Sequence, residues 1–120
     1  MNDIYILDPV YVGGTFYGAR FELIDEVDNN GTITDVPVDL TGCDAIMSLV
    51  DALGRVACTY RTSNNTLQID SNALILPEHI VSVPYGVYSF DFNIKSVSGE
   101  VIPGFAQGSW SILKPKTIRQ

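Results

Sequence analysis

Apolar and polar residues alternate strictly from Tyr88 to Lys95, where an aromatic or aliphatic side chain stands at every second position. A period of two places the two sets of side chains on opposite faces of an extended strand. The Ser98-Gly99 pair that follows is suited to a tight reversal of the chain. The pattern therefore predicts a β-hairpin with one buried face, formed by residues 86–97 and 101–113.

The register of this hairpin has two possible solutions. A two-residue turn at Ser98-Gly99 sets Phe92 opposite Phe105, whereas a three-residue turn, or a bulge at Pro103-Gly104, shifts the pairing. In the shifted register the facing pairs are Tyr88 with Trp110, Phe90 with Gly108 and Phe92 with Ala106. We favour the shifted register, because large residues facing small ones fill a core better and a glycine after a proline suits a bulge.

Strand and turn signals alternate along the rest of the chain, and no stretch has helical periodicity of useful length. Residues 15–24 are predicted to form one long strand, with Tyr17, Ala19, Phe21 and Leu23 on one face. Residues 25–31 are expected to be a loop, and residues 32–38 are compatible with a second strand of that hairpin. Further short strands are expected at 4–7, 44–50, 55–61, 66–70 and 73–76, and the segment 77–84 allows one helical turn.

Seven or eight strands without crossover helices favour an all-β fold, an antiparallel two-layer β-sandwich of the Ig-like kind, with a small barrel as the second choice. The chain has 120 residues, of which 46% are hydrophobic and 18% charged, as in a globular protein. We expect a single domain over 1–120, with a short N-terminal arm (about 1–13) and a basic C-terminal tail (about 114–120). No apolar run approaches the roughly 20 residues that span a bilayer, so no membrane association is expected.

The net charge of −7 is unevenly distributed. Residues 1–51 contain ten of the 14 carboxylates and one arginine, a balance that disfavours nucleic acid as a partner. The tail "KPKTIRQ" places Lys114, Lys116 and Arg119 close together. It is either a solvated terminus or a contact to an acidic neighbour, for example the acidic half of another copy. The N-terminus "MNDIYILDPV" lacks a basic segment and a long apolar segment, so no signal peptide is expected.

The two cysteines are not expected to form a disulfide. If residues 51–54 form a turn, Met47 faces Cys58 and Leu49 faces Val56. Cys43 then lies about 13 Å along the ladder from Cys58, whereas a disulfide needs α-carbons within roughly 7 Å. Both residues are interpreted as small buried thiols, consistent with folding in a reducing compartment.

The sequence offers little for catalysis. His79 is the single histidine, so it alone would have to supply the base of a triad or the imidazole of a metal site. The "VGGT" segment lacks the spacing and the lysine of a phosphate loop. We therefore expect no enzyme, no cofactor and no catalytic residue.

One acidic segment, residues 25–31, partly matches a calcium loop. Glu26, Asp28 and Asn30 alternate before Gly31, but Pro37 stands where the bidentate glutamate is expected. A polar hairpin turn with Asn-Gly chemistry explains the same residues, and we favour it over a metal site.

Four aromatic residues near strand starts or in loops are candidates for an interaction surface: Tyr5, Tyr11, Phe16 and Tyr85. Each is able to cover an end of the sandwich, to contact another subunit, or to stack on a sugar ring. We favour the subunit contact over the sugar, because no pair of tryptophans is present to form a planar platform.

Three segments together carry a family resemblance: "GGTFYGARFELID", "VPVDLTGCDAIMSLVDALGRV" and "YGVYSFDFNIKSVSGEVIPGFAQGSWSI". They resemble a module of tailed-bacteriophage virion proteins, including the N-terminal domains of upper baseplate proteins, over about positions 13–113. The resemblance implies a β-sandwich that assembles with copies of itself, often as trimers, and docks on a tail, baseplate or capsid. Longer members continue into a receptor-binding or fibre segment, whereas this sequence ends just after the predicted sandwich, so we expect an adaptor or a capsid-decorating protein.

The leading hypothesis is thus a non-enzymatic phage structural protein. It would be made in the host cytoplasm, located in the virion, homo-oligomeric, and bound to other virion proteins. The alternative, from a different class, is a carbohydrate-binding β-sandwich module. It is motivated by the loop aromatics and the acidic loops.

Overall fold

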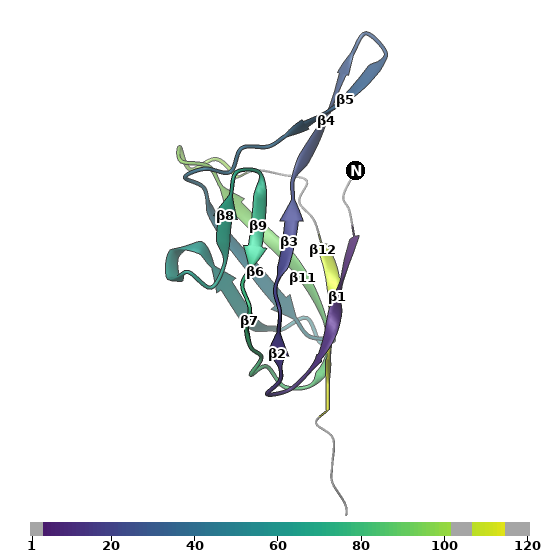
Figure 1. Cartoon of the computed structure of the whole chain (residues 1–120), viewed down its shortest axis with the longest axis vertical. Helices are drawn as coiled ribbons and strands as arrows, with labels where there is room; N and C mark the ends of the chain where they lie inside the picture. Colours follow the sequence, from purple (N-terminus) through teal and green to yellow (C-terminus); the bar gives the residue numbers. More distant parts are fainter. Residues whose placement is uncertain (1–3, 102–106, 115–120) are drawn as a thin grey trace, which may run out of the picture.

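The computed structural model describes residues 4–101 and 107–114, and it is built almost entirely of β-strands (Figure 1). The strands are β1 (Ile4–Tyr11), β2 (Thr15–Phe16), β3 (Ala19–Glu22), β4 (Ile24–Asn29), β5 (Thr32–Pro37), β6 (Asp44–Val50), β7 (Val56–Arg61), β8 (Gln68–Asp70), β9 (Ala73–Leu76), β10 (His79–Ile80), β11 (Gly86–Lys95) and β12 (Gln107–Leu113). The single helical segment within these ranges is the 3-10 turn η1 (Thr62–Asn64). It lies between β7 and β8.

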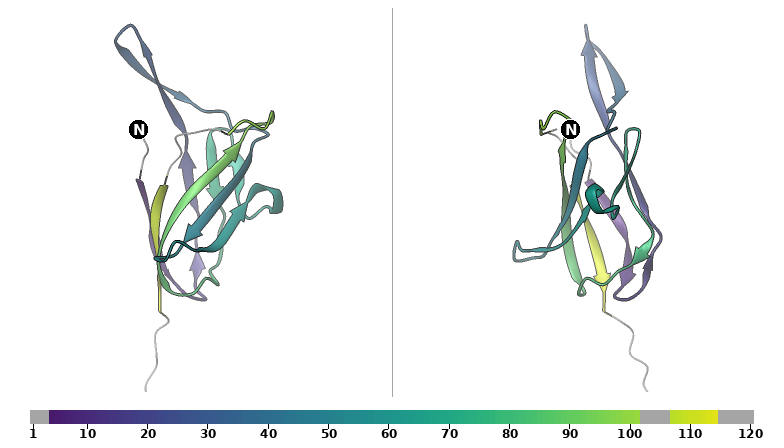
Figure 2. Two further views of the ribbon diagram at one scale, coloured as in Figure 1. Left: turned by 180° about the vertical axis from the view of Figure 1, so that it is seen from behind. Right: turned by 90° about the vertical axis from the view of Figure 1, so that its left-hand side faces the viewer.

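The strands form two layers, as seen edge-on in Figure 2. One layer is a five-stranded sheet in the order β1-β12-β11-β6-β7, and the other contains β3-β9-β8 and the short pair β2-β10. The predicted all-β, sandwich-like fold is confirmed, with one correction to its wholly antiparallel pairing. β1 runs parallel to β12, with a register shift between Leu7 and Val10. Residues 4–11 of the expected N-terminal arm are therefore an edge strand of the main sheet.

The core lies between the two layers and follows the predicted alternation on β11. Tyr88, Phe90, Phe92 and Ile94 are buried, and the residues between them are exposed. Phe21 of the opposite layer packs its ring 5.8 Å from that of Phe90 and 5.0 Å from that of Phe92. Aromatic rings from both layers therefore fill the centre of the sandwich.

The favoured hairpin register is confirmed where the structure describes it. Tyr88 pairs with Trp110 and Phe90 with Gly108, whereas the expected partner of Phe92 lies outside the described residues. A Cβ atom at Gly108 would overlap the carbonyl of Tyr5 and the ring of Phe90. Glycine at this position therefore makes room for the large ring opposite it.

The predicted long strand over residues 15–24 is wrong, because the chain breaks at Gly18. This glycine has a φ of +104°, a conformation that favours glycine. β2 before the break pairs with β10, and β3 after it pairs with β9. The break also changes which side chains face inward, so Phe16 is buried and Tyr17, expected inside, is 82% exposed. The described residues form twelve strands and not the expected seven or eight, because the break divides one expected strand into β2 and β3 and because β4 and β10 lie in segments that were not expected to be strands.

The predicted register of β6 and β7 is wrong by two residues. Met47 pairs with Tyr60 and Leu49 with Cys58, with an irregularity before Val50. The turn is longer than assumed, because Asp51 N donates to the carbonyl of Arg55 at 2.9 Å. A shift of two leaves each side chain on its predicted face. The expectation of free cysteines is confirmed for Cys43 and Cys58.

The largest departure from expectation is a projecting hairpin, which we call the acidic hairpin (residues 24–37). Residues 25–31, expected as a loop, belong largely to β4, which pairs with β5. Asn30 and Gly31 have φ values of 55° and 89°, which fit the tight turns that join twisted strands. The hairpin extends beyond both layers (Figures 1 and 2), and the molecule measures 68 × 31 × 27 Å.

Candidate interaction surfaces

The acidic hairpin concentrates negative charge at one end of the molecule. It contains four carboxylates and no basic residue, and every residue from Ile24 to Pro37 is exposed. Glu26 pairs directly with Asp35, and Asp28 lies on the same face of the ribbon. Like charges placed opposite each other destabilise a β-ribbon. A cationic partner would relieve this repulsion.

The same hairpin exposes apolar side chains. Ile33 is 66% exposed, Ile24 50%, Val36 43% and Val27 38%. The pairing places Ile33 and Ile24 on the face that carries Glu26, Asp28 and Asp35. An isolated two-stranded ribbon is marginally stable in water, and no second layer covers either face of this one. The hairpin thus offers a mixed apolar and acidic surface.

Backbone hydrogen bonds join the base of the hairpin to the body. Leu23 N donates to the carbonyl of Asn72 at 2.8 Å, and Val38 N donates to that of Leu23 at 3.0 Å. Leu23 itself is buried. The hairpin therefore begins and ends at an anchored point, although its own residues lie in solvent.

The opposite end of the molecule carries a second surface, which we call the basal groove. This hollow of about 500 Å³ lies between the β6–β7 turn and the start of β11, and it is lined by Asp51, Ala52, Leu53, Arg55, Ala57, Pro84, Tyr85, Gly86, Val87 and Tyr88. Three of its apolar residues are well exposed, Leu53 at 76%, Val87 at 67% and Tyr85 at 58%. Apart from Asp51 and Arg55, the side chains that line it are apolar or aromatic.

Two cations border the basal groove. The Nζ of Lys114, just after β12, lies 5.9 Å from the centre of the Tyr85 ring. The guanidinium of Arg55 is 3.1 Å from the Oδ2 of Asp51, and its side chain is 72% exposed. The carboxylate of Asp51 also accepts hydrogen bonds from the backbone N–H groups of Arg55 and Leu53. These bonds, chiefly the one from Arg55, lower the pKa of Asp51 below its ordinary value. Asp51 thereby holds the turn that presents Leu53.

The sequence-predicted interaction residues are only partly brought together. Tyr85 and Lys114 are in contact, and Tyr11 pairs with Leu113, the neighbour of Lys114. Tyr5 is half-buried, with its ring 5.3 Å from that of Phe21. Lys116 and Arg119 lie outside the described residues.

Phe16 requires a correction, because it is a core residue and not part of an accessible surface. Its side chain is 5% exposed, and its ring lies 4.8 Å from that of Trp110. The break at Gly18 turns Phe16 inward and Tyr17 outward. Tyr17 is the exposed aromatic that the sequence pattern missed, because a continuous strand would have buried it.

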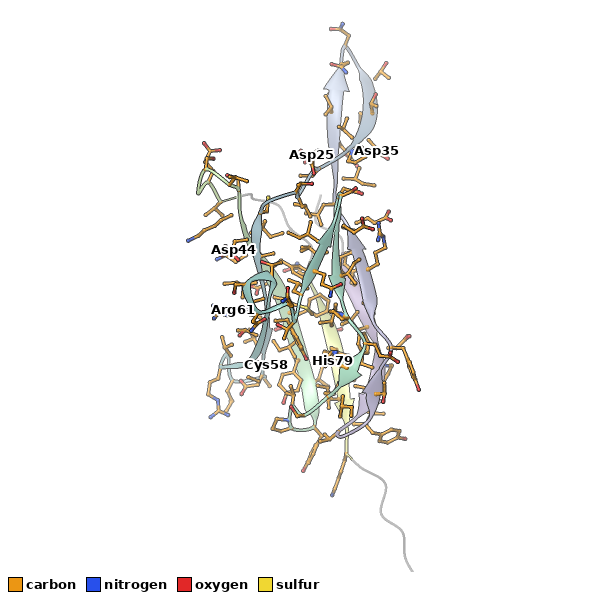
Figure 3. The ribbon with its side chains drawn as sticks, turned by 60° about the vertical axis from the view of Figure 1, so that its left-hand side comes forward. Asp25, Asp35, Asp44, Cys58, Arg61 and His79 are labelled. Carbon is orange, nitrogen blue, oxygen red and sulfur yellow. The ribbon has the colours of Figure 1, made fainter. Side chains whose placement is uncertain are left out.

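Both ring nitrogens of His79 form hydrogen bonds within the protein. Its Nδ1 donates to the carbonyl of Pro77 at 2.8 Å, which leaves Nε2 to accept a hydrogen bond from the Tyr60 hydroxyl at 3.0 Å. Burial raises the pKa of Tyr60 well above its ordinary value. With both ring nitrogens bonded, His79 joins the two layers, and Figure 3 shows it far from Asp25 and Asp35 of the acidic hairpin.

The calcium-like segment consists of strand residues of β4 followed by the turn at Asn30 and Gly31. The Oδ1 of Asp28 accepts a hydrogen bond from Gly31 N at 2.9 Å, as in an ordinary polar turn. Among the residues that the structure describes, no group of three or more His, Cys, Asp or Glu side chains is placed to hold a metal ion. The carboxylates of the acidic hairpin thus have no arrangement that resembles a built cation site.

Comparison with known proteins does not assign a role to these surfaces. No protein-family model matches the chain, and no curated protein matches it significantly. Within the described ranges no helix has the length and apolar character needed to cross a bilayer. Function must therefore be inferred from the fold, the two end surfaces and the sequence resemblance.

Proposed function

We propose that this chain is a non-enzymatic structural protein of a tailed-phage virion, made in the host cytoplasm, that associates with copies of itself and docks on other virion proteins. The observation that carries the proposal is the acidic hairpin, which projects beyond the body with exposed isoleucine and valine side chains. A segment of this kind adds little to the core, and its surface is of the sort that protein contacts cover.

Three features support the proposal. The buried core fills the space between the two layers, so a partner would bind the outer surfaces of the sandwich. The single histidine is engaged in structural hydrogen bonds with Tyr60 and Pro77. The resemblance to phage virion modules implies self-association, often as trimers.

Two measurements test this function. Sedimentation velocity of the purified chain is expected to give a defined oligomer, with a trimer at three times the 13.1 kDa of one chain. Mass spectrometry of purified phage particles, produced from a host that expresses the gene, is expected to detect the chain. A protein that stays monomeric at every concentration and is absent from particles would contradict the proposal.

Carbohydrate binding is the second candidate, favoured by one specific observation. Tyr17 is 82% exposed beside a hollow of about 370 Å³ that includes Arg20, Pro77 and Glu78. An exposed aromatic ring with charged neighbours is able to stack on a sugar and bind its hydroxyl groups. A glycan array, run with and without calcium, tests this directly, with Tyr17→Ala as the matched control. An array without hits removes this candidate.

A further inference from the structure

We propose that the acidic hairpin of one copy docks head to tail in the basal groove of a second copy of this chain. The inference rests on the self-association proposed above and names the two surfaces that make it. In Figure 1 the acidic hairpin projects from one end of the sandwich, and the strand ends that line the groove lie toward the other end, so one chain cannot join its own two surfaces. The contact must form between copies.

Charge complementarity is the first reason to choose a second copy as the occupant. The carboxylate face of the hairpin combines Glu26, Asp28 and Asp35, whereas the groove is bordered by Lys114 and by Arg55, which is paired with Asp51. Because Asp51 offsets Arg55, these groove residues carry an excess of one positive charge from Lys114, which attracts the carboxylate face of another copy.

Apolar complementarity is the second reason. Ile33 is 66% exposed on the same face as the carboxylates, and its neighbours Asp28 and Asp35 flank it on the ribbon. The groove exposes Leu53, Tyr85 and Val87 between its cations. Docking would place Ile33 against these three side chains and the carboxylates against the cations. An apolar centre with a charged rim is typical of protein interfaces.

The geometry of such a contact determines the assemblies it can form. Hairpin and groove are different surfaces, so the contact is heterologous. Heterologous contacts close into a ring when the rotation between copies allows it and otherwise propagate as a filament. A three-membered ring would agree with the trimer that the sequence resemblance implies.

A charge-swap experiment tests the pairing. The hairpin variant carries Glu26→Lys, Asp28→Lys and Asp35→Lys, and the groove variant carries Arg55→Glu and Lys114→Glu. Each variant alone opposes like charges, so we expect its self-association to weaken about tenfold or more in sedimentation velocity. Mixed in equal amounts, the two variants are expected to associate again into complexes that contain both by native mass spectrometry. The ratio is 1:1 in a dimer, an even-numbered ring or a filament, and 2:1 or 1:2 in a three-membered ring, which retains one contact between like charges.

Each matched control is a variant with the same number of charge reversals, placed outside both the acidic hairpin and the basal groove. Glu78, Asp91 and Glu100 are exposed outside both surfaces, so their triple change to lysine should leave association unchanged. Arg61→Glu with Lys95→Glu is the corresponding control for the groove variant. All changed residues are exposed, and near-ultraviolet circular dichroism of the buried Trp110 reports whether each variant remains folded.

Each contrary outcome is distinguishable. If the hairpin variant associates as strongly as the wild type, the docking proposal is overturned while self-association stands. If the wild type is monomeric but present in phage particles, the hairpin meets a different virion protein, and the copy-to-copy contact is wrong. If the two variants fail to associate when mixed although each is folded, the pairing of these two surfaces is wrong.

Discussion

Strand β11 and the acidic hairpin show how differently two hydrogen-bonded β-segments use their apolar residues. On β11 the inward side chains from Tyr88 to Ile94 are at most 8% exposed, whereas the least exposed apolar side chain of the hairpin, Val27, is 38% exposed. Backbone pairing is present in both. The difference is the second layer, which covers β11 and does not reach the hairpin. Strand formation and burial are therefore separate properties of this chain.

This contrast has a thermodynamic consequence. Burial of apolar area is the dominant favourable term in folding, at about 25 cal/mol per Å² removed from water. The body should therefore supply nearly all of the free energy of unfolding. The hairpin is free to carry side chains selected for another purpose, including opposed carboxylates that a folding core would not tolerate.

The largest expected effect is in the core. Phe21→Ala removes a ring that is 1% exposed and packs against Phe90 and Phe92, so it should lower the free energy of unfolding by about 3–5 kcal/mol. Ile33→Ala on the hairpin is the matched control, and its effect on the isolated chain should stay within about 0.5 kcal/mol. Urea denaturation measures both. Similar losses for the two variants would mean that the hairpin belongs to the folding core.

The next effect concerns the fit between the aromatic rings and the strand opposite. Gly108→Val places side-chain atoms where Phe90 and the Tyr5 carbonyl lie, so a loss of about 1–3 kcal/mol or more is expected from overpacking. Ser111→Val on the same strand, across from the exposed Val87, should be nearly neutral. Thermal unfolding compares the two. A neutral Gly108→Val would show that the paired register in solution differs from the one described.

A smaller effect is expected where the two layers are joined by polar groups. Tyr60→Phe removes the hydroxyl that donates a hydrogen bond to His79 Nε2 at 3.0 Å. The partly buried Nε2 then has no protein donor for this bond. The expected cost is about 1–3 kcal/mol in urea denaturation. Tyr85→Phe, at an exposed position, should change the free energy of unfolding by less than about 0.5 kcal/mol. Equal effects would argue against a structural role for the Tyr60 and His79 pair.

The smallest effect appears at alkaline pH. Burial, followed by the nearby Cys58, raises the pKa of Tyr60 in the folded protein, so the folded state holds this proton more tightly than the unfolded state does. Stability from this group is therefore complete below the ordinary tyrosine pKa of about 10 and falls as pH rises above it, by at most about 1.4 kcal/mol per pH unit. Tyr60→Phe should make the loss of stability between about pH 10 and 11 less steep, because this range lies just above the ordinary tyrosine pKa of about 10. An unchanged slope would contradict the assignment.

Much of the body was predictable from sequence because its signals are local. The alternation on β11 predicted which side chains are buried, and the size of facing residues predicted the pairing of Tyr88 with Trp110 and of Phe90 with Gly108. The predicted register of β6 and β7 was wrong by two residues, but the prediction of which side chains share a face was correct, since a shift of two keeps each side chain on its face.

The candidate surfaces were less predictable, because exposure depends on what lies above a strand. The aromatic candidates included Phe16, which is core, and omitted Tyr17, which is exposed, because the break at Gly18 exchanges their faces. The residues of 25–31 were interpreted as a loop because carboxylates and asparagines are rare in strands. Asn30-Gly31 and the apolar residues Ile33 and Val36 were the available signals for a hairpin.

By itself, the amino-acid sequence determined the all-β composition of the described body, its buried stripe along β11 and the separation of acidic and basic segments, since period, residue size and charge are properties of neighbouring positions. Only the tertiary structure decided that β1 joins β12 in parallel and that residues 24–37 stand outside both layers. It also decided that Tyr85 and Lys114 meet at the opposite end. These results depend on contacts between segments far apart in the chain, which no local pattern encodes.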